Sequence, residues 1–173
     1  MSTALDPRSE ERLKALDRYQ ILDTFPESRF ERLTRLASNI FGTPISLISL
    51  IDEHRQWFKS HRGMDECETP LGVSFCKYAL EQDSIMVVPD ATQDDRFREN
   101  PLVTSDPGIR FYAGAPLRTP EGTSIGTLCV IDTLPRPRLT AMERQILEDL
   151  AALVIDELEL RAAPRKASGK KER

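Results

Sequence analysis

The side chains able to carry covalent or acid–base chemistry are few in this sequence. It contains three cysteines, two histidines and one group of aspartates, at positions 90, 94 and 95. Glycine-rich phosphate-binding loops, the H-E-x-x-H zinc motif, the G-x-S-x-G nucleophile motif and the C-x-x-C pair are all absent. The common catalytic signatures therefore give no reason to expect an enzyme.

The histidines and aspartates each have a structural explanation. His54 and His61 fall on a predicted turn and strand, on opposite faces and about 23 Å apart at full extension, so they are not expected to share a metal. Asp90, Asp94 and Asp95 lack the alternation and the glycine of a calcium loop. Such side chains commonly stabilise turns and cap helices. The alternative for the aspartates is that they hydrogen-bond a ligand.

Two of the three cysteines are predicted to be buried. Cys76 lies on the apolar side of a predicted helix, and Cys129 lies between two apolar residues of a predicted strand. Buried cysteines usually behave as small apolar side chains. Cys67 stands in a loop among acidic residues, which disfavour the reactive thiolate. Because the chain begins without an apolar signal-like segment, reduced thiols are expected throughout.

The helices that would position these residues are indicated by their caps. Asp6-Pro7 is typical of a helix start. A capping box of Thr24 and Glu27 predicts a helix that ends before Gly42, and a second box predicts a helix over residues 140–161. A short helix is predicted over 74–81. One helical turn is predicted over 96–99.

The predicted strands cover residues 45–51, 56–61 and 85–88 and a hairpin of 109–117 with 124–131. The strand 45–51 is apolar at odd and even positions, so both of its faces must be covered. On the strand 56–61, Trp57 and Phe58 point to opposite faces. The order of the elements predicts an α+β fold with an antiparallel sheet and helices on both faces.

The charge is unevenly distributed along the 173 residues. The net charge is −4, but the last ten residues contain five basic residues and one acidic residue. The rest therefore has 19 basic and 27 acidic side chains and a net charge of −8. An acidic body argues against a nucleic-acid-binding surface, and no apolar run is long enough to span a membrane. We expect a cytoplasmic protein with a lead-in at 1–11, a domain at 12–162 and a flexible basic tail at 163–173.

A series of motifs in order resembles the GAF domain family over about residues 12–162. The series comprises Tyr19-Gln-Ile-Leu-Asp-Thr24, Ile45-Ser-Leu-Ile-Ser-Leu-Ile-Asp52, Arg55-Gln-Trp-Phe58, Glu68-Thr-Pro70, Ser74-Phe-Cys76, Val88-Pro-Asp-Ala91, Asp94-Asp-Arg-Phe97, Asn100-Pro-Leu-Val103, Ile109-Arg-Phe-Tyr-Ala-Gly-Ala-Pro-Leu117 and Gly126-Thr-Leu-Cys-Val-Ile-Asp132. The subgroup it is similar to accompanies bacterial sensor histidine kinases and cyclic-dinucleotide enzymes. The resemblance implies a GAF-like antiparallel sheet of five or six strands and a ligand cavity roofed by the 74–81 helix and the 89–101 segment.

The ligand-binding candidates follow from that cavity and from the polar stretch Pro89–Pro101 after a buried strand. Aromatic residues would form its walls, although for Trp57 and Tyr112 a plain core role is equally compatible with the sequence. Aspartates would accept hydrogen bonds from the ligand. The candidates are Trp57, Phe75, Cys76, Asp90, Asp94, Phe97 and Tyr112.

Three functions are compatible with the sequence. The first is a non-catalytic sensory or regulatory domain that binds a small molecule and signals through dimeric terminal helices to a separate histidine kinase or cyclic-dinucleotide output protein. The dimer is expected because Leu153, Ile155 and Leu158 cannot all face one neighbour. The second is a thiol-dependent reductase of the free-methionine-sulfoxide reductase type, although Gly72-Val-Ser-Phe75 stands where that group has Gly-Val-Cys-Gly. The third is a ligand-free dimerisation module. The sequence identifies no cofactor and no metal site.

Overall fold

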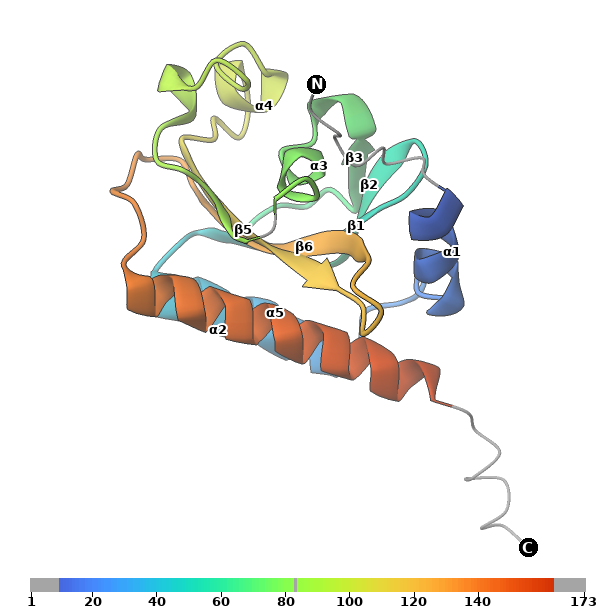
Figure 1. Ribbon diagram of the computed structural model, residues 1–173. Coiled ribbons are helices and arrows are strands. Elements are labelled where there is room, and N and C mark those ends of the chain that lie inside the picture. Colours follow the sequence, from blue (N-terminus) through green and yellow to red (C-terminus); the bar gives the residue numbers. More distant parts are fainter. Residues whose placement is uncertain (1–9, 83, 164–173) are drawn as a thin grey trace, which may run out of the picture.

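The architecture is given by a computed structural model that describes residues 10–82 and 84–163. Within these residues six antiparallel strands form one sheet, in the order β3-β2-β1-β6-β5-β4 (Figure 1). The strands are β1 (Ile45–Ile51), β2 (Arg55–Arg62), β3 (Glu68–Pro70), β4 (Met86–Val88), β5 (Phe111–Arg118) and β6 (Ser124–Asp132). Every residue of β1 and β6 is buried, as expected for central strands that are covered on both faces.

Helices cover the sheet on both sides, which confirms the α+β fold expected from the sequence (Figure 1). The long helices α2 (Ser28–Phe41) and α5 (Ala141–Ala162) lie together against one face. They run antiparallel, because Glu27 at the start of α2 contacts Arg161 at the end of α5. The short helices α3 (Cys76–Ala79) and α4 (Pro101–Thr104) lie over the other face, and α1 (Glu10–Arg18) lies beside the sheet.

The sheet separates two apolar cores because successive strand residues point to opposite faces. On β1, Ile48 and Leu50 join the core beneath α2 and α5, whereas Leu47 and Ile51 join the core beneath α3. We call these the helix-side core and the site-side core. On β6 the same alternation places Cys129 on the site side.

Local sequence signals located several elements correctly. Gly42 ends α2 in the left-handed conformation, with φ of 64°. The Thr140 hydroxyl accepts a hydrogen bond from the Glu143 amide, and the Glu143 carboxylate accepts one from the Thr140 amide, which confirms the capping box of α5. The hairpin of β5 and β6 is also confirmed.

Other expected boundaries were wrong. Thr24 does not cap α2, which begins after Glu27, because the Thr24 hydroxyl instead donates to the Ile21 carbonyl and accepts from Lys59. The helix expected over 74–81 is regular only over Cys76–Ala79. Residues 95–99 form turns, and the regular helix α4 follows at Pro101, where the Asn100 side chain accepts a hydrogen bond from the Leu102 amide. The expected helix start at Asp6-Pro7 and most of the expected tail lie outside the described residues.

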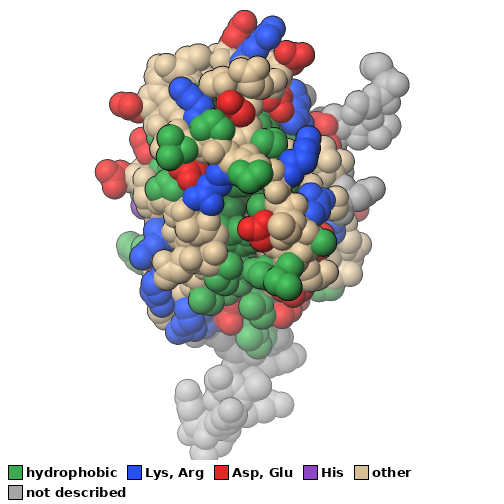
Figure 2. Space-filling view, turned by 90° about the vertical axis from the view of Figure 1, so that its left-hand side faces the viewer, with side chains coloured by type: hydrophobic (Ala, Val, Ile, Leu, Met, Phe, Trp, Pro, Cys, Tyr) green, Lys and Arg blue, Asp and Glu red, His purple; other side chains and the backbone are tan. Residues whose placement is uncertain are grey.

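The outer surface of α2 and α5 keeps several apolar side chains in solvent. Leu36 and Ile40 on α2 are 41% and 50% exposed, and Leu153 on α5 is 46% exposed. Ile155 and Leu158 are instead buried in the helix-side core. At the end of the molecule where α2 finishes and α5 begins, Figure 2 shows apolar side chains gathered between basic ones. None of the described helices is long and apolar enough to cross a membrane.

Candidate functional site

A chain of hydrogen-bonded, buried polar side chains links the start of α3 to the sheet. The Ser74 hydroxyl donates to the Gln56 side-chain carbonyl over 2.7 Å, and the Gln56 amide donates to the Thr69 hydroxyl over 3.0 Å. Ser74 also accepts a hydrogen bond from the Lys77 amide. One serine thus fastens the start of α3 to β2 and β3.

Aromatic rings fill the middle of this space. Phe75 and Phe97 stack with their centroids 4.0 Å apart and their planes 6° from parallel. Tyr112 on β5 lies 5.4 Å from Phe75, and Tyr78 meets Phe97 edge-on at 5.1 Å. Because Phe75 precedes α3, Tyr78 lies within it and Phe97 comes from the loop before α4, the stack holds both segments against the sheet.

Hydroxyl and thiol groups line the floor beneath the rings. The Tyr112 hydroxyl donates to Cys76 Sγ over 3.2 Å, and Cys76 Sγ lies 3.6 Å from Ser49 Oγ. Thr127 on β6 pairs in register with Ser49, so its side chain points to the same face of the sheet. The Thr127 hydroxyl is buried on this floor, where it interacts with Cys76, Tyr112 and Cys129.

The two cysteines and the tyrosine of the site have pKa values that differ from their ordinary values. Burial by itself would raise the pKa of Cys76, but hydrogen bonds from Cys129, Thr127, Tyr112 and Ser49 outweigh it and lower that pKa to about 7. Burial and the neighbouring Cys76 raise the pKa of Cys129. The same causes raise the pKa of Tyr112 well above its ordinary value. The site therefore contains one thiol that releases its proton more readily than an ordinary cysteine and two groups that hold their protons more tightly than usual.

The two aspartate candidates are engaged in the loop that carries them. Asp90 accepts hydrogen bonds from the amide and hydroxyl of Thr92. Asp94 accepts from the Arg96 amide and forms an ion pair with the Arg96 guanidinium at 2.8 Å. Hydrogen bonds from Arg96 lower the pKa of Asp94. Both carboxylates thus stabilise turns in this structure.

The open volume at the centre of the site is small. A partly enclosed cavity of about 20 Å³ lies between β1, β2 and α3, with Phe58, Phe75, Cys76 and Tyr112 in its wall. That volume suffices for one water molecule, whereas ligand pockets for small organic molecules usually measure some 300–1,000 Å³. The protein's own aromatic rings occupy the place where the sequence predicts a ligand.

The structure brings four of the seven predicted site residues into contact with one another. These are Phe75, Cys76, Phe97 and Tyr112. Asp90 and Asp94 belong to the loop above them. Trp57 does not join this group, because it lies in the helix-side core and Phe58 is the neighbour that faces the site. Ser49, Gln56, Ser74 and Thr127 were missed, although small polar residues inside apolar strands such as 45–51 were a usable signal.

A second polar cluster lies at the far end of α5 and has a structural role. The Glu27 carboxylate contacts Lys59 Nζ at 2.8 Å and Arg161 Nε at 2.6 Å. The Tyr19 hydroxyl donates to the Glu159 carboxylate. We call Tyr19, Glu27, Lys59, Glu159 and Arg161 the α5 clamp, because together they join the end of α5 to α2, to β2 and to the segment after α1.

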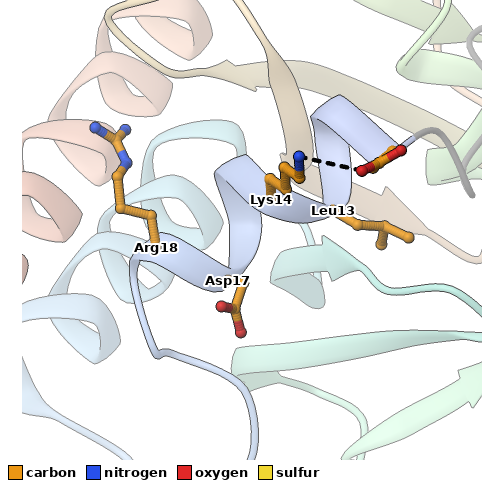
Figure 3. Close-up of a pocket in the computed structure, with 5 residues that line it drawn as sticks. Leu13, Lys14, Asp17 and Arg18 are labelled. Atoms are coloured by element: carbon orange, nitrogen blue, oxygen red, sulfur yellow. Dashed lines mark ion pairs between the residues drawn. The ribbon is translucent and has the colours of Figure 1, made fainter.

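Larger hollows on the surface do not resemble binding sites. One of about 640 Å³ runs along α1 and is lined by Glu10, Leu13, Lys14, Asp17 and Arg18 (Figure 3). Its wall comes from a single helix, and the close-up shows Lys14 turned toward Glu10, with which it forms an exposed ion pair at 3.1 Å. Among the described residues no group of three or more metal-ligating side chains comes together.

Known proteins share the sequence pattern and the fold of this chain. The model of the GAF domain matches residues 26–158. The chain belongs to the GAF domain family. It is 44% identical over 156 residues to a cyclic di-GMP phosphodiesterase of Pseudomonas aeruginosa. That match covers 90% of this chain but only 27% of the relative, so this GAF domain spans about a quarter of the relative's length.

Solved structures support the same fold at low sequence identity. The GAF domain region of a putative membrane protein from Geobacter sulfurreducens has a TM-score of 0.61 at 19% identity, over 88% of this chain and 99% of that one. A domain of a putative two-component sensor histidine kinase from Sinorhizobium meliloti has a TM-score of 0.58 at 16% identity, over 83% and 95%. A type II free methionine-R-sulfoxide reductase from Thermoplasma acidophilum has a TM-score of 0.61 at 14% identity, over 86% and 96%. At these identities the likeness shows the fold and not the activity.

Proposed function

We propose that this GAF domain is a non-catalytic regulatory module that binds a small molecule between the sheet and the α3–α4 segment. The observation that carries the proposal is an aromatic stack that lies over a buried floor of hydroxyl and thiol groups. A ligand with a flat or apolar body and a polar group would stack on the rings and hydrogen-bond to that floor. Phe75 and Phe97 would have to separate to admit it, because the open volume is about 20 Å³.

The helices of the segment that would move are short. α3 and α4 each contain four residues, and the Asn100 amide donates to the Val73 carbonyl between them over 3.2 Å. Short helices have little stability of their own and depend on packing. Separation of the aromatic stack would therefore release the roof of the site without breaking any strand pairing.

The signal would leave through the sheet and the long helices. β6 carries Cys129 toward the site and Leu128 and Val130 toward the helix-side core that contains α5 residues. A shift of β6 would therefore displace side chains in both the site-side core and the helix-side core. We infer a homodimer through α2 and α5, with a histidine kinase or a cyclic-dinucleotide enzyme as the output, by analogy with the relatives named above.

The proposal is tested by ligand capture with two matched variants. Tyr112→Phe keeps the ring and removes the hydroxyl, and Thr127→Val removes a hydroxyl from the floor at constant shape. Thermal shift of each variant against a metabolite panel should show a compound that stabilises the wild type and stabilises Thr127→Val less. Phe111→Leu, on the helix-side core, is the control that alters packing without altering the site. A ligand that stabilises all four proteins equally would refute this location.

A further inference from the structure

Cys76 lies directly above the central strand β6, with partners on both flanking strands. It contacts Ser49 on β1 and the Tyr112 hydroxyl on β5. The Tyr112 hydroxyl sits over Gly114, where an added Cβ would approach it to 2.3 Å. Ser49 pairs in register with Thr127, and Gly114 pairs with Cys129. Cys76 Sγ is thereby located between the side chains of Thr127 and Cys129, which share one face of β6.

We propose that Cys76 and Cys129 are an oxidant-sensitive thiol pair, in which Cys76 is oxidised by a small hydroperoxide and Cys129 closes an internal disulfide. Both cysteines are free in the described structure, which therefore represents the reduced state. A bridge would fasten α3 to the middle of the sheet. The proposal goes beyond ligand binding and does not depend on it.

The surroundings of Cys76 favour the reactive form of a thiol. Thiolates, rather than thiols, react with peroxides, and hydrogen-bond donors around sulfur stabilise the thiolate. Tyr112 and Cys129 are the titratable groups that face Cys76 from β5 and β6, and both keep their protons at neutral pH. They can therefore donate to the Cys76 sulfur, consistent with its lowered pKa of about 7.

The size of the neighbouring cavity selects the oxidant. Cys76 lines the cavity of about 20 Å³, which has room for a molecule close to water in size. Hydrogen peroxide approaches that size, whereas an amino-acid sulfoxide is several times larger. Cys76, the residue of the pair that would react first, thus borders a space of a size suited to a small peroxide.

The reaction balances in two steps. The Cys76 thiolate attacks one oxygen of hydrogen peroxide, the O–O bond breaks, and hydroxide leaves to become water as Cys76 sulfenic acid forms. The Cys129 sulfur then attacks the Cys76 sulfur, the S–S bond forms, and the S–O bond breaks. The released hydroxide takes up the Cys129 proton as a second water. The two thiols lose two electrons in total and the peroxide gains them.

Thiol counting after peroxide treatment tests the pair. Folded protein is treated with hydrogen peroxide at pH 7, quenched with catalase, unfolded and alkylated with N-ethylmaleimide. The chain has three cysteines. Untreated protein should take up three labels, and oxidised protein should take up one, on the exposed Cys67. Peptide mapping should find Cys76 linked to Cys129, and dithiothreitol should restore three labels.

Three variants separate a built pair from accidental oxidation. Cys129→Ala should leave Cys76 as a sulfenic acid that dimedone traps, and Cys67→Ser should oxidise like the wild type. Tyr112→Phe, which keeps the ring and removes one donor, should slow the loss of labels at pH 7 several-fold and move its pH midpoint upward. The proposal fails if folded wild type retains all three labels, if the link includes Cys67, or if unfolded chain forms the Cys76–Cys129 link as fast as folded protein.

Discussion

Glu27 is the residue on which the α5 clamp depends. Its carboxylate contacts Lys59 from β2 and Arg161 from α5, and the Lys59 side chain is fully enclosed. Burial by itself would raise the pKa of Glu27, but hydrogen bonds from Lys59 and Arg161 outweigh it and hold the pKa below its ordinary value. An enclosed ammonium group without this counter-charge would be costly to keep.

Glu27→Gln should therefore lower the free energy of unfolding at pH 7 by about 2 kcal/mol. The folded-state pKa of Glu27 is depressed, so its contribution is complete above the ordinary carboxyl pKa and is lost as the pH falls through the folded-state pKa. Urea unfolding at pH 7, 5 and 3 should show the difference from wild type shrinking at the lowest pH. Glu53→Gln, at an exposed turn, is the control and should change stability little. A difference that is constant from pH 7 to pH 3 would contradict this role.

Cys76 and Cys129 also decide the catalytic alternative. If the domain were a free-methionine-sulfoxide reductase, the wild type should consume free methionine sulfoxide in the presence of dithiothreitol, and Cys76→Ala should not. We expect equal, background rates for both, because Ser74 stands where that group has the cysteine of Gly-Val-Cys-Gly. A rate that falls at least tenfold in Cys76→Ala would establish the reductase instead.

At the scale of elements, α5 combines a buried face with an apolar seam on its outer side. Ile146, Leu153 and Leu160 recur every seven residues, a spacing that keeps side chains on one side of a helix and suits pairing with another helix. Leu153 and Leu160 are 46% and 64% exposed, and Leu36 and Ile40 on α2 are also exposed. A second copy of the chain packed on this layer would cover them.

Leu153→Glu should therefore shift the protein toward monomer. Sedimentation velocity at micromolar concentrations should give a dimer for the wild type and a smaller species for the variant, with an unchanged circular dichroism spectrum. Ala152→Glu adds the same charge in the same turn of α5, on the exposed side that carries Asp149 and Asp156, and should remain dimeric. A wild type that sediments as a monomer at these concentrations would contradict the proposed dimer.

Elements with strong local signals were predictable, and contacts set by tertiary structure were not. The alternating and continuous apolar patterns predicted β1, β5 and β6, and the Thr140 capping box fixed the start of α5. The three-residue β3 has no apolar pattern to reveal it. The sequence placed Trp57 and Phe58 on opposite faces but could not say which faced the site, because both are apolar. The prediction that Thr24 caps α2 was wrong because its hydroxyl instead accepts a hydrogen bond from Lys59, 35 residues away.

At the scale of the whole molecule, one sheet separates the candidate site from the long helices. The aromatic stack, the thiol pair and the Thr127 hydroxyl lie on one face, and α2 and α5 lie on the other. Since β6 contributes side chains to both cores, occupation of the site would be transmitted to α5 by small shifts of a rigid, fully buried strand. This arrangement is the one expected of the regulatory domain proposed above.

Native mass spectrometry of freshly purified protein tests the central claim most directly. A regulatory domain that binds a small molecule at this site should retain added mass in the wild type and in the control Phe111→Leu. The same mass should be lost from Tyr112→Ala, which removes the ring and hydroxyl that line the site. The account predicts the adduct in the first two proteins and its absence in the third. A wild type with only the bare mass of the chain, in the presence and absence of added cell extract, would contradict it.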